Sequence, residues 1–196
     1  MNFKLFGATV TVSYPFLAVL TVFFTLDRTG LGGQMFCAAL LHELGHLVVM
    51  YRFGQAPRSI DFVSFGIRIQ KRPSTAVSYG KEIAIYLAGP LVNLMTAGVL
   101  LCLAGGRFTQ LSLIHLLMGL YNLLPIGALD GGMIVRNLAS CFSDPRRAEK
   151  ICRTVSLLFL IPLAAAGILL GLRGQANITL AVTLIYLAFT IFSSRH

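Results

Sequence analysis

Two histidines and a glutamate form the pattern with the clearest chemistry in this sequence. His42, Glu43 and His46 lie in the run HELGH, and the residues around it are mostly Leu, Ala, Val and Met. Positions i and i+4 share one face of a helix, so the two imidazoles can bind one metal ion while Glu43 is turned toward a water on that ion. The pattern is typical of a hydrolytic metal site. The alternative is a pair of core histidines hydrogen-bonded across helices, which would leave Glu43 in need of a separate partner.

Asp130 is the candidate for a third ligand, because a catalytic zinc site usually has three protein ligands and one open position. Of the seven acidic residues, only Glu43 and Asp130 fall inside apolar runs, where a charged group indicates function. His46 precedes Arg52 by six residues, and Asp130 precedes Arg136 by six. Since both arginines end apolar runs, the two ligand sets are predicted at equal depth.

Two asparagines within apolar runs are further candidates. Asn122 and Asn93 could donate hydrogen bonds to a developing oxyanion or hold a substrate backbone. The alternative for both is a hydrogen bond between helices. His115 is excluded from the site, since it lies fifteen residues before Asp130, about 22 Å along a straight helix.

The composition indicates a membrane protein. Of the 196 residues 56% are hydrophobic and 12% are charged, against about 25% charged in ordinary globular chains. The net charge of +9 raises nucleic acid as a partner, but no basic stripe with interleaved aromatic residues is present. We therefore expect the lipid bilayer, and no nucleic acid, as the partner of the basic residues.

Charged residues divide the chain into six apolar runs, each near the roughly 20 residues that cross a bilayer as a helix. The expected fold is an all-α polytopic membrane protein with six transmembrane helices and a small membrane-associated β-sheet. Residues 1–196 are expected to form a single integral-membrane domain, with core spans over about 5–135 and two C-terminal spans. The predicted spans are 5–26, 29–51, 83–106, 108–135, 154–172 and 174–194.

Two polar or β-branched segments predict the sheet. Residues 60–70 alternate apolar and polar side chains, which is typical of a half-buried strand. Residues 3–12 are rich in β-branched side chains, and we predict that the two strands pair. Within the first span, Tyr14-Pro15 predicts the start of a short helix over about 15–27. Asp144-Pro145 likewise predicts the start of a short surface helix.

The distribution of Lys and Arg predicts the orientation. The N-terminus, residues 52–82, residues 136–153 and the C-terminus carry thirteen of them, and the opposite side carries three. Because cytoplasmic loops hold the excess of positive charge, both termini are predicted to be cytoplasmic.

The sequence resembles the site-2 protease family of intramembrane zinc metalloproteases. The resemblance depends on HELGH at 42–46, GPLVN at 89–93 and the NxxPxxxLDG pattern at 122–131. It implies zinc bound by His42, His46 and Asp130, with Glu43 as the general base. Six expected spans without an appended PDZ or CBS domain look like the compact bacterial branch that includes stage IV sporulation protein FB.

The function that the resemblance implies is cleavage of a peptide bond in a transmembrane or membrane-associated protein, near the cytoplasmic leaflet of a bacterial cell membrane. One zinc ion per chain is the expected cofactor, and a regulatory membrane protein is a further expected partner. The alternative is a metal-binding membrane transporter or a catalytically inactive chaperone of the same fold. A transporter would have no need for Glu43 beside the ligands and would need more polar residues along a path.

Overall fold

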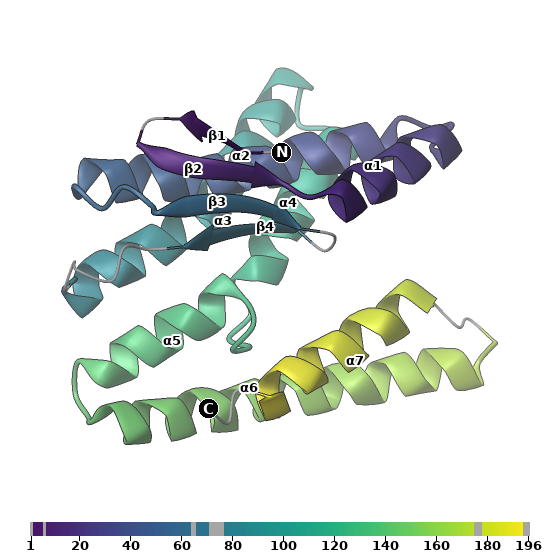
Figure 1. Ribbon diagram of the computed structural model, residues 1–196. Coiled ribbons are helices and arrows are strands. Elements are labelled where there is room, and N and C mark those ends of the chain that lie inside the picture. The colour runs from purple at the N-terminus through teal and green to yellow at the C-terminus, as the bar shows by residue number, and fades with distance from the viewer. Residues whose placement is uncertain (1, 6, 64–65, 71–76, 175–177, 194–196) are drawn as a thin grey trace. The chain divides into compact units, whose positions relative to one another are not determined.

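The chain folds into seven helices and four strands within the residues that the computed structural model describes, which are 2–5, 7–63, 66–70, 77–174 and 178–193. Figure 1 shows their order along the chain. The chain divides into two compact units, an N-terminal unit over Met1–Gly119 and a C-terminal unit over Leu120–His196. Each unit is described by itself.

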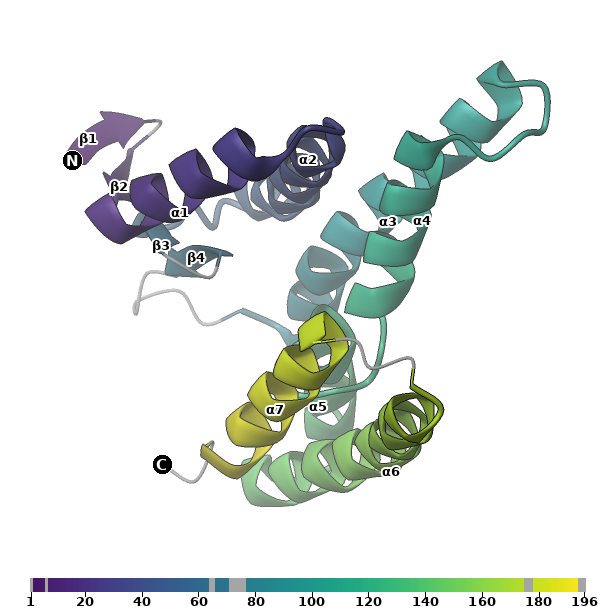
Figure 2. The same cartoon turned by 90° about the vertical axis from the view of Figure 1, so that its right-hand side faces the viewer.

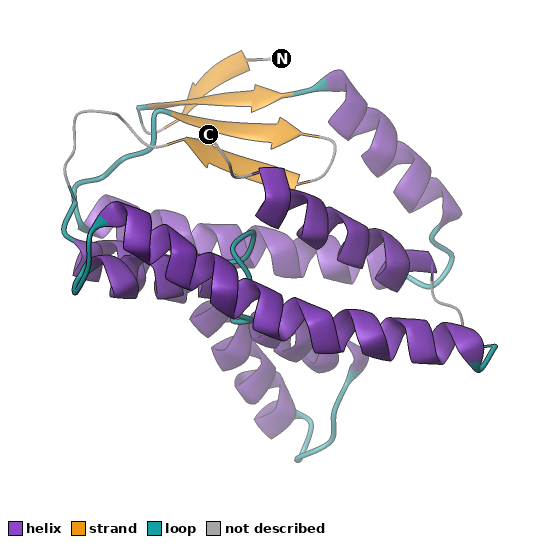
Figure 3. Cartoon of the chain, turned by 90° about the horizontal axis from the view of Figure 1, so that it is seen from below, coloured by secondary structure: helices purple, strands orange, loops and turns teal. Residues whose placement is uncertain are grey.

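A four-stranded sheet belongs to the N-terminal unit, as Figure 3 shows in orange. Its order is β1-β2-β3-β4. The outer pairs β1–β2 and β3–β4 are antiparallel, and β2 pairs with β3 in parallel, with Val10 opposite Ile60. The strands are β1 (Asn2–Leu5), β2 (Ala8–Val12), β3 (Ser59–Val63) and β4 (Gly66–Gln70).

The predicted pairing of the two segments is confirmed, but the prediction of one strand in each was wrong. Each segment forms two antiparallel strands that are close in sequence. In the first, Gly7 has a φ of 81°, a conformation that glycine adopts without a steric penalty and that suits a tight turn. The alternating pattern continues through both arms of a hairpin, so periodicity alone does not reveal the turn.

Four helices complete the N-terminal unit: α1 (Tyr14–Leu26), α2 (Leu31–Arg52), α3 (Tyr79–Leu103) and α4 (Gln110–Asn122), whose last residues extend beyond the unit. The predicted start of the first helix is confirmed. The Ser13 hydroxyl accepts a hydrogen bond from the Phe16 N–H at 3.3 Å, and Pro15 occupies the first turn, where its missing N–H costs nothing.

Helices α2 and α3 pack closely because small residues lie where they meet. A Cβ atom on Gly45 would lie 2.8 Å from the backbone oxygen of Ala88, so only glycine permits this approach of the two backbones. In an apolar solvent, helices associate through such close packing and through interhelical hydrogen bonds. This close approach lies at the level of the HELGH run and fixes that face of α2 against α3.

The C-terminal unit contains α5 (Asp130–Ser140), α6 (Pro145–Leu172) and α7 (Ile178–Ser193). Its core is formed by Ile126 from the loop before α5, Leu160 from α6, and Leu187 and Ile191 from α7. Ile126 is fully buried. The loop before α5 is therefore anchored by its packing against α6 and α7.

Two predictions about this half of the chain were wrong. The apolar run 108–135 forms two helices, α4 and α5, because the segment around Pro125 leaves the helix. Residues 145–153 form the first turns of α6 and no separate surface helix. The predicted helix start itself is confirmed, since the Asp144 carboxylate accepts a hydrogen bond from the Arg147 N–H at 3.1 Å.

Three helices among the described residues are long and apolar enough to cross a membrane, namely α2, α3 and α6. Helix α1 and residues 180–191 of α7 are apolar but shorter. The chain is thus a mostly helical membrane protein with a small sheet, as predicted. The number of six spans stays a prediction.

Candidate metal centre

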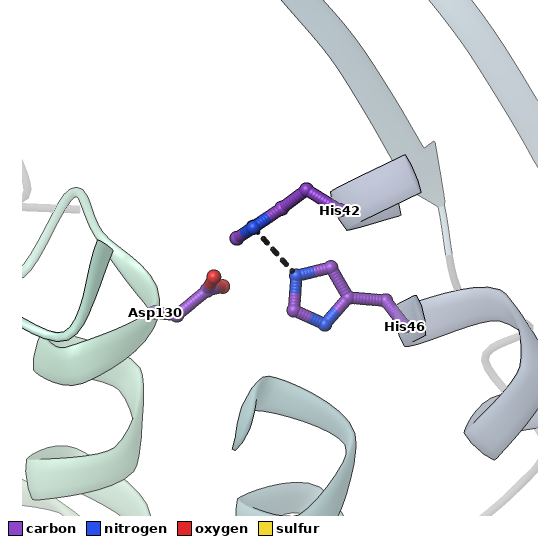
Figure 4. A group of neighbouring side chains, drawn as sticks. All are labelled: His42, His46 and Asp130. Carbon is purple, nitrogen blue, oxygen red and sulfur yellow. Dashed lines mark hydrogen bonds between the residues drawn. The ribbon is translucent and has the colours of Figure 1, made fainter. Parts of the chain in front are cut away.

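His42 and His46 place their Nε2 atoms side by side. Both side chains are buried on α2, with exposed fractions of 5% and 7%, and the two Nε2 atoms are 3.1 Å apart (Figure 4). Two nitrogen ligands of a tetrahedral zinc ion, each bound at 2.0–2.1 Å, would lie about 3.3 Å apart. The pair has the spacing that one metal ion needs.

The other ring nitrogen of His46 fixes the tautomer of that imidazole. Its Nδ1 lies 2.7 Å from the backbone oxygen of Ile85 on α3. Because a carbonyl oxygen only accepts, Nδ1 carries the hydrogen and donates it, so Nε2 keeps a lone pair for a metal.

Asn93 and His115 lie behind His42. The Asn93 Nδ2 atom is 3.2 Å from His42 Nδ1, and the Asn93 Oδ1 atom is 3.1 Å from His115 Nδ1. Asn93 is fully buried, and His115 is 4% exposed. Helices α3 and α4 run side by side there, as Figure 2 shows.

These hydrogen bonds bear on two sequence interpretations. The Asn93 amide meets an imidazole on each side, which favours the interhelical alternative over substrate binding for this residue. His115, which sequence reasoning set aside, is connected to His42 through a single amide. The distance along one helix to Asp130 could not reveal this connection, because the connection runs across three helices.

Gly89 lies against both imidazoles, although the sequence analysis named it only as the first residue of GPLVN. A Cβ atom there would contact His46 Nε2 and would lie 2.7 Å from His46 Cε1 and 2.8 Å from His42 Nε2. No real Cβ makes such contacts. Glycine in GPLVN therefore keeps the space in front of both ligand nitrogens clear.

Asp130 belongs to the C-terminal unit, where it is the first residue of α5. The backbone N–H groups at a helix N-terminus favour a carboxylate at that position. The next residue, Gly131, lies so close to the backbone of Leu123 and Leu124 that a Cβ atom would contact both carbonyl oxygens. Only glycine at position 131 therefore allows the start of α5 to pack against the turn that precedes it.

A buried serine of α6 holds the same loop. The Ser156 hydroxyl accepts a hydrogen bond from the Gly127 N–H at 2.9 Å and donates one to the Cys152 carbonyl at 2.7 Å. The Cys152 thiol lies 3.4 Å from the Gly132 carbonyl. Sequence reasoning missed Ser156, since a lone serine in an apolar helix carries no signal of its partner.

Glu43 and Asn122 are the remaining candidate site residues. Glu43 follows His42 on α2 and is half-buried, and Asn122 ends α4 and is half-buried. His42 and His46 each offer one nitrogen, and Asp130 offers one carboxylate oxygen, as ligand atoms for a metal ion. Two imidazole nitrogens and a carboxylate oxygen are a donor set that suits zinc.

The chain is similar to known proteins in sequence and in fold. Residues 106–163, which include Asp130, match the family model "Peptidase family M50". The structure resembles the site-2 protease of Methanocaldococcus jannaschii with a TM-score of 0.69 and 25% identity, over 100% of this chain and 95% of that one. The resemblance to the site-2 protease family is confirmed.

Two proteins with sequences similar to this chain are named as zinc metalloproteases. One from Methanocaldococcus jannaschii is 27% identical over 93% of this chain, and the putative zinc metalloprotease Rip3 of Mycobacterium tuberculosis is 38% identical over 54%. Stage IV sporulation protein FB of Bacillus subtilis is 26% identical over 91% of the chain. The chain spans 56%, 30% and 64% of the lengths of these relatives.

We predict that Gly89→Ala abolishes stoichiometric zinc binding, because the added methyl group occupies the space between the two ligand nitrogens. The control is Gly98→Ala on the same helix, where a Cβ atom meets nothing within 4 Å. This second variant should bind zinc as the wild type does. Metal analysis of both purified proteins checks the prediction, and normal zinc content in Gly89→Ala would contradict it.

Proposed function

We propose that this chain is an intramembrane zinc endopeptidase that cleaves a transmembrane or membrane-associated protein near the cytoplasmic leaflet. The observation that carries the proposal is the pair of buried Nε2 atoms 3.1 Å apart, with Glu43 between their residues in sequence. An apolar helix that holds this set has no structural need for its carboxylate. The names of the relatives support the same activity.

His42, His46 and Asp130 are the proposed ligands of one zinc ion. The support for Asp130 is its carboxylate at the start of α5, its place inside the matched family region and its spacing from Arg136. A zinc ion held by this set would acidify water and polarise the scissile carbonyl.

Glu43 is the proposed general base. Its carboxylate would accept a proton from the attacking water and then donate that proton to the amide nitrogen that leaves. The carbonyl carbon gains the water oxygen, the C–N bond breaks, and the carboxylate regains its charge. Half-burial of Glu43 is compatible with this role, since the group needs access to water.

Replacement of this base separates the proposed protease from a transporter. In Glu43→Gln we expect cleavage to fall by at least ~100-fold, because the amide cannot accept the proton, while zinc content stays at the level of the wild type. The measurement is cleavage of candidate substrates co-expressed with either protein, together with metal analysis of both. Undiminished cleavage would refute the proposed mechanism, and retained metal flux would favour a transporter.

The proposed orientation has six spans in a bacterial cell membrane and both termini in the cytoplasm. It is supported by thirteen Lys and Arg residues on the proposed cytoplasmic side. Within the C-terminal unit, four of these cations line a single cavity at the start of α6, namely Arg136, Arg146, Lys150 and Arg153. A cluster of this sign suits the side of the membrane that carries anionic lipid headgroups.

The proposed substrate segment binds in an extended form along β4. A helical segment hides its carbonyls in intrahelical hydrogen bonds, so it must unwind before attack. Strand β3 is paired on both sides, whereas β4 has β3 on one side only among the described strands. An extended peptide could add to this edge.

Asn122 is the proposed hydrogen-bond donor to the substrate or to the oxyanion. A membrane protein is the proposed regulator.

Proline substitutions in β4 test this binding mode. Successive N–H groups of a strand point to opposite sides, so Ile67→Pro and Arg68→Pro remove one outward donor and one donor to β3. We expect the variant that loses the outward donor to cleave substrate about 10-fold more slowly or worse, since a lost hydrogen bond to substrate costs about 1.5 kcal/mol. Its zinc content should be unchanged. Full cleavage by both variants would contradict addition at this edge.

A further inference from the structure

Five polar groups form a continuous chain of hydrogen bonds through the N-terminal unit. The chain begins at the Ile85 carbonyl and passes through the imidazoles of His46 and His42, with distances of 2.7 and 3.1 Å. It continues through the Asn93 amide to His115, with distances of 3.2 and 3.1 Å. Every side chain in it is more than nine-tenths buried, so water does not replace these partners.

The direction of the hydrogen bonds depends on which end of the Asn93 amide faces His42, because an amide donates at its nitrogen and accepts at its oxygen. With the nitrogen toward His42 Nδ1, that atom has to accept, and the hydrogen of His42 then lies on Nε2, toward His46 Nε2. The Asn93 oxygen then lies toward His115 Nδ1, which has to donate. In this direction His42 carries a hydrogen on the nitrogen that a metal would need.

When His42 binds a metal, the hydrogen bonds from His42 through Asn93 to His115 have to run in the opposite direction. His42 can bind a metal through Nε2 only if its hydrogen lies on Nδ1, which then has to donate to an oxygen. Asn93 offers that oxygen if its amide turns over, and its nitrogen then donates to His115 Nδ1. His115 must accept, so its hydrogen moves to Nε2. Each ring keeps one hydrogen, and the sum of protons does not change.

We propose that Asn93 and His115 are positioning residues of the metal centre, and that the hydrogen-bond chain from His42 to His115 reverses its direction when zinc binds. Asparagine suits this role because a half-turn of its amide exchanges a donor and an acceptor at the same place. His115 suits it because its two neutral tautomers either donate or accept at Nδ1. The inference rests on the proposed zinc site.

The tautomer of His115 is the direct test. The chain has four histidines, so ¹⁵N-histidine labelling gives few ring signals, and the spectrum of a His115→Gln variant identifies those of His115. In the purified full chain we expect His115 to be protonated at Nδ1 when a chelator has removed zinc and at Nε2 after zinc is added. The same tautomer in both samples would overturn the proposal.

Zinc affinity gives a second readout, measured by competition with a chelator. Asn93→Leu should weaken binding by about 10- to 100-fold, which is the usual effect of removing a partner of a metal-bound histidine. Asn93→Asp should bind at least as tightly as the wild type, because a carboxylate accepts from both imidazoles and needs no reversal. The control is Thr96→Val, one turn further along α3, whose hydroxyl donates only to the Val92 carbonyl among the bonds described.

The outcomes separate this inference from the proposed function. A wild-type chain that binds no zinc would refute the proposed metal site and, with it, the reversal that zinc is proposed to cause. A wild-type chain that binds zinc, beside an Asn93→Leu variant of equal affinity, would refute only the role of Asn93. A purely structural role predicts that Asn93→Asp, with a buried charge, loses affinity as Asn93→Leu does.

Discussion

The hydrogen-bonded partners of two buried imidazoles are the constraint on which the rest of the site depends. A polar group in an apolar interior costs free energy unless it is paired, and each imidazole has two nitrogens to pair. His46 and His42 use one nitrogen each on a group of α3, namely the Ile85 carbonyl and the Asn93 amide. The other nitrogens then face each other. Orientation of the two rings, rather than their sequence spacing alone, makes the pair fit for one ion.

Glycine at points of close approach makes these orientations possible. Gly45 lets the backbones of α2 and α3 come together, and Gly89 keeps the ligand nitrogens accessible. In the C-terminal unit, Gly131 lets the loop fold against the start of α5, while Ser156 and the buried Ile126 tie that loop to α6 and to the core. The two units therefore use the same means. Small residues allow the close approach of backbones, and a few buried hydrogen bonds hold the two imidazoles in one unit and the loop before Asp130 in the other.

The sequence was sufficient where a local pattern carries the information. HELGH predicted two histidines with convergent nitrogens, and Asp144-Pro145 and Tyr14-Pro15 predicted helix starts that the structure contains. It was insufficient where packing joins distant helices. The break between α4 and α5 and the turn at Gly7 depend on backbone conformations that the apolar pattern does not mark. Helices α2, α3 and α4 pack together in a way that no local pattern predicts. This packing decides the partners of Asn93 and His115, and it places Gly89 against the two imidazoles.

The most direct test of the central claim is X-ray absorption spectroscopy at the zinc edge of the purified full chain, with metal analysis of the same sample. The account predicts one zinc per chain with two imidazole nitrogens and oxygen donors at about 2.0–2.2 Å, and loss of this tight site in Asp130→Ala. A sulfur ligand at about 2.3 Å would contradict it, as would zinc that remains unchanged after Asp130 is replaced.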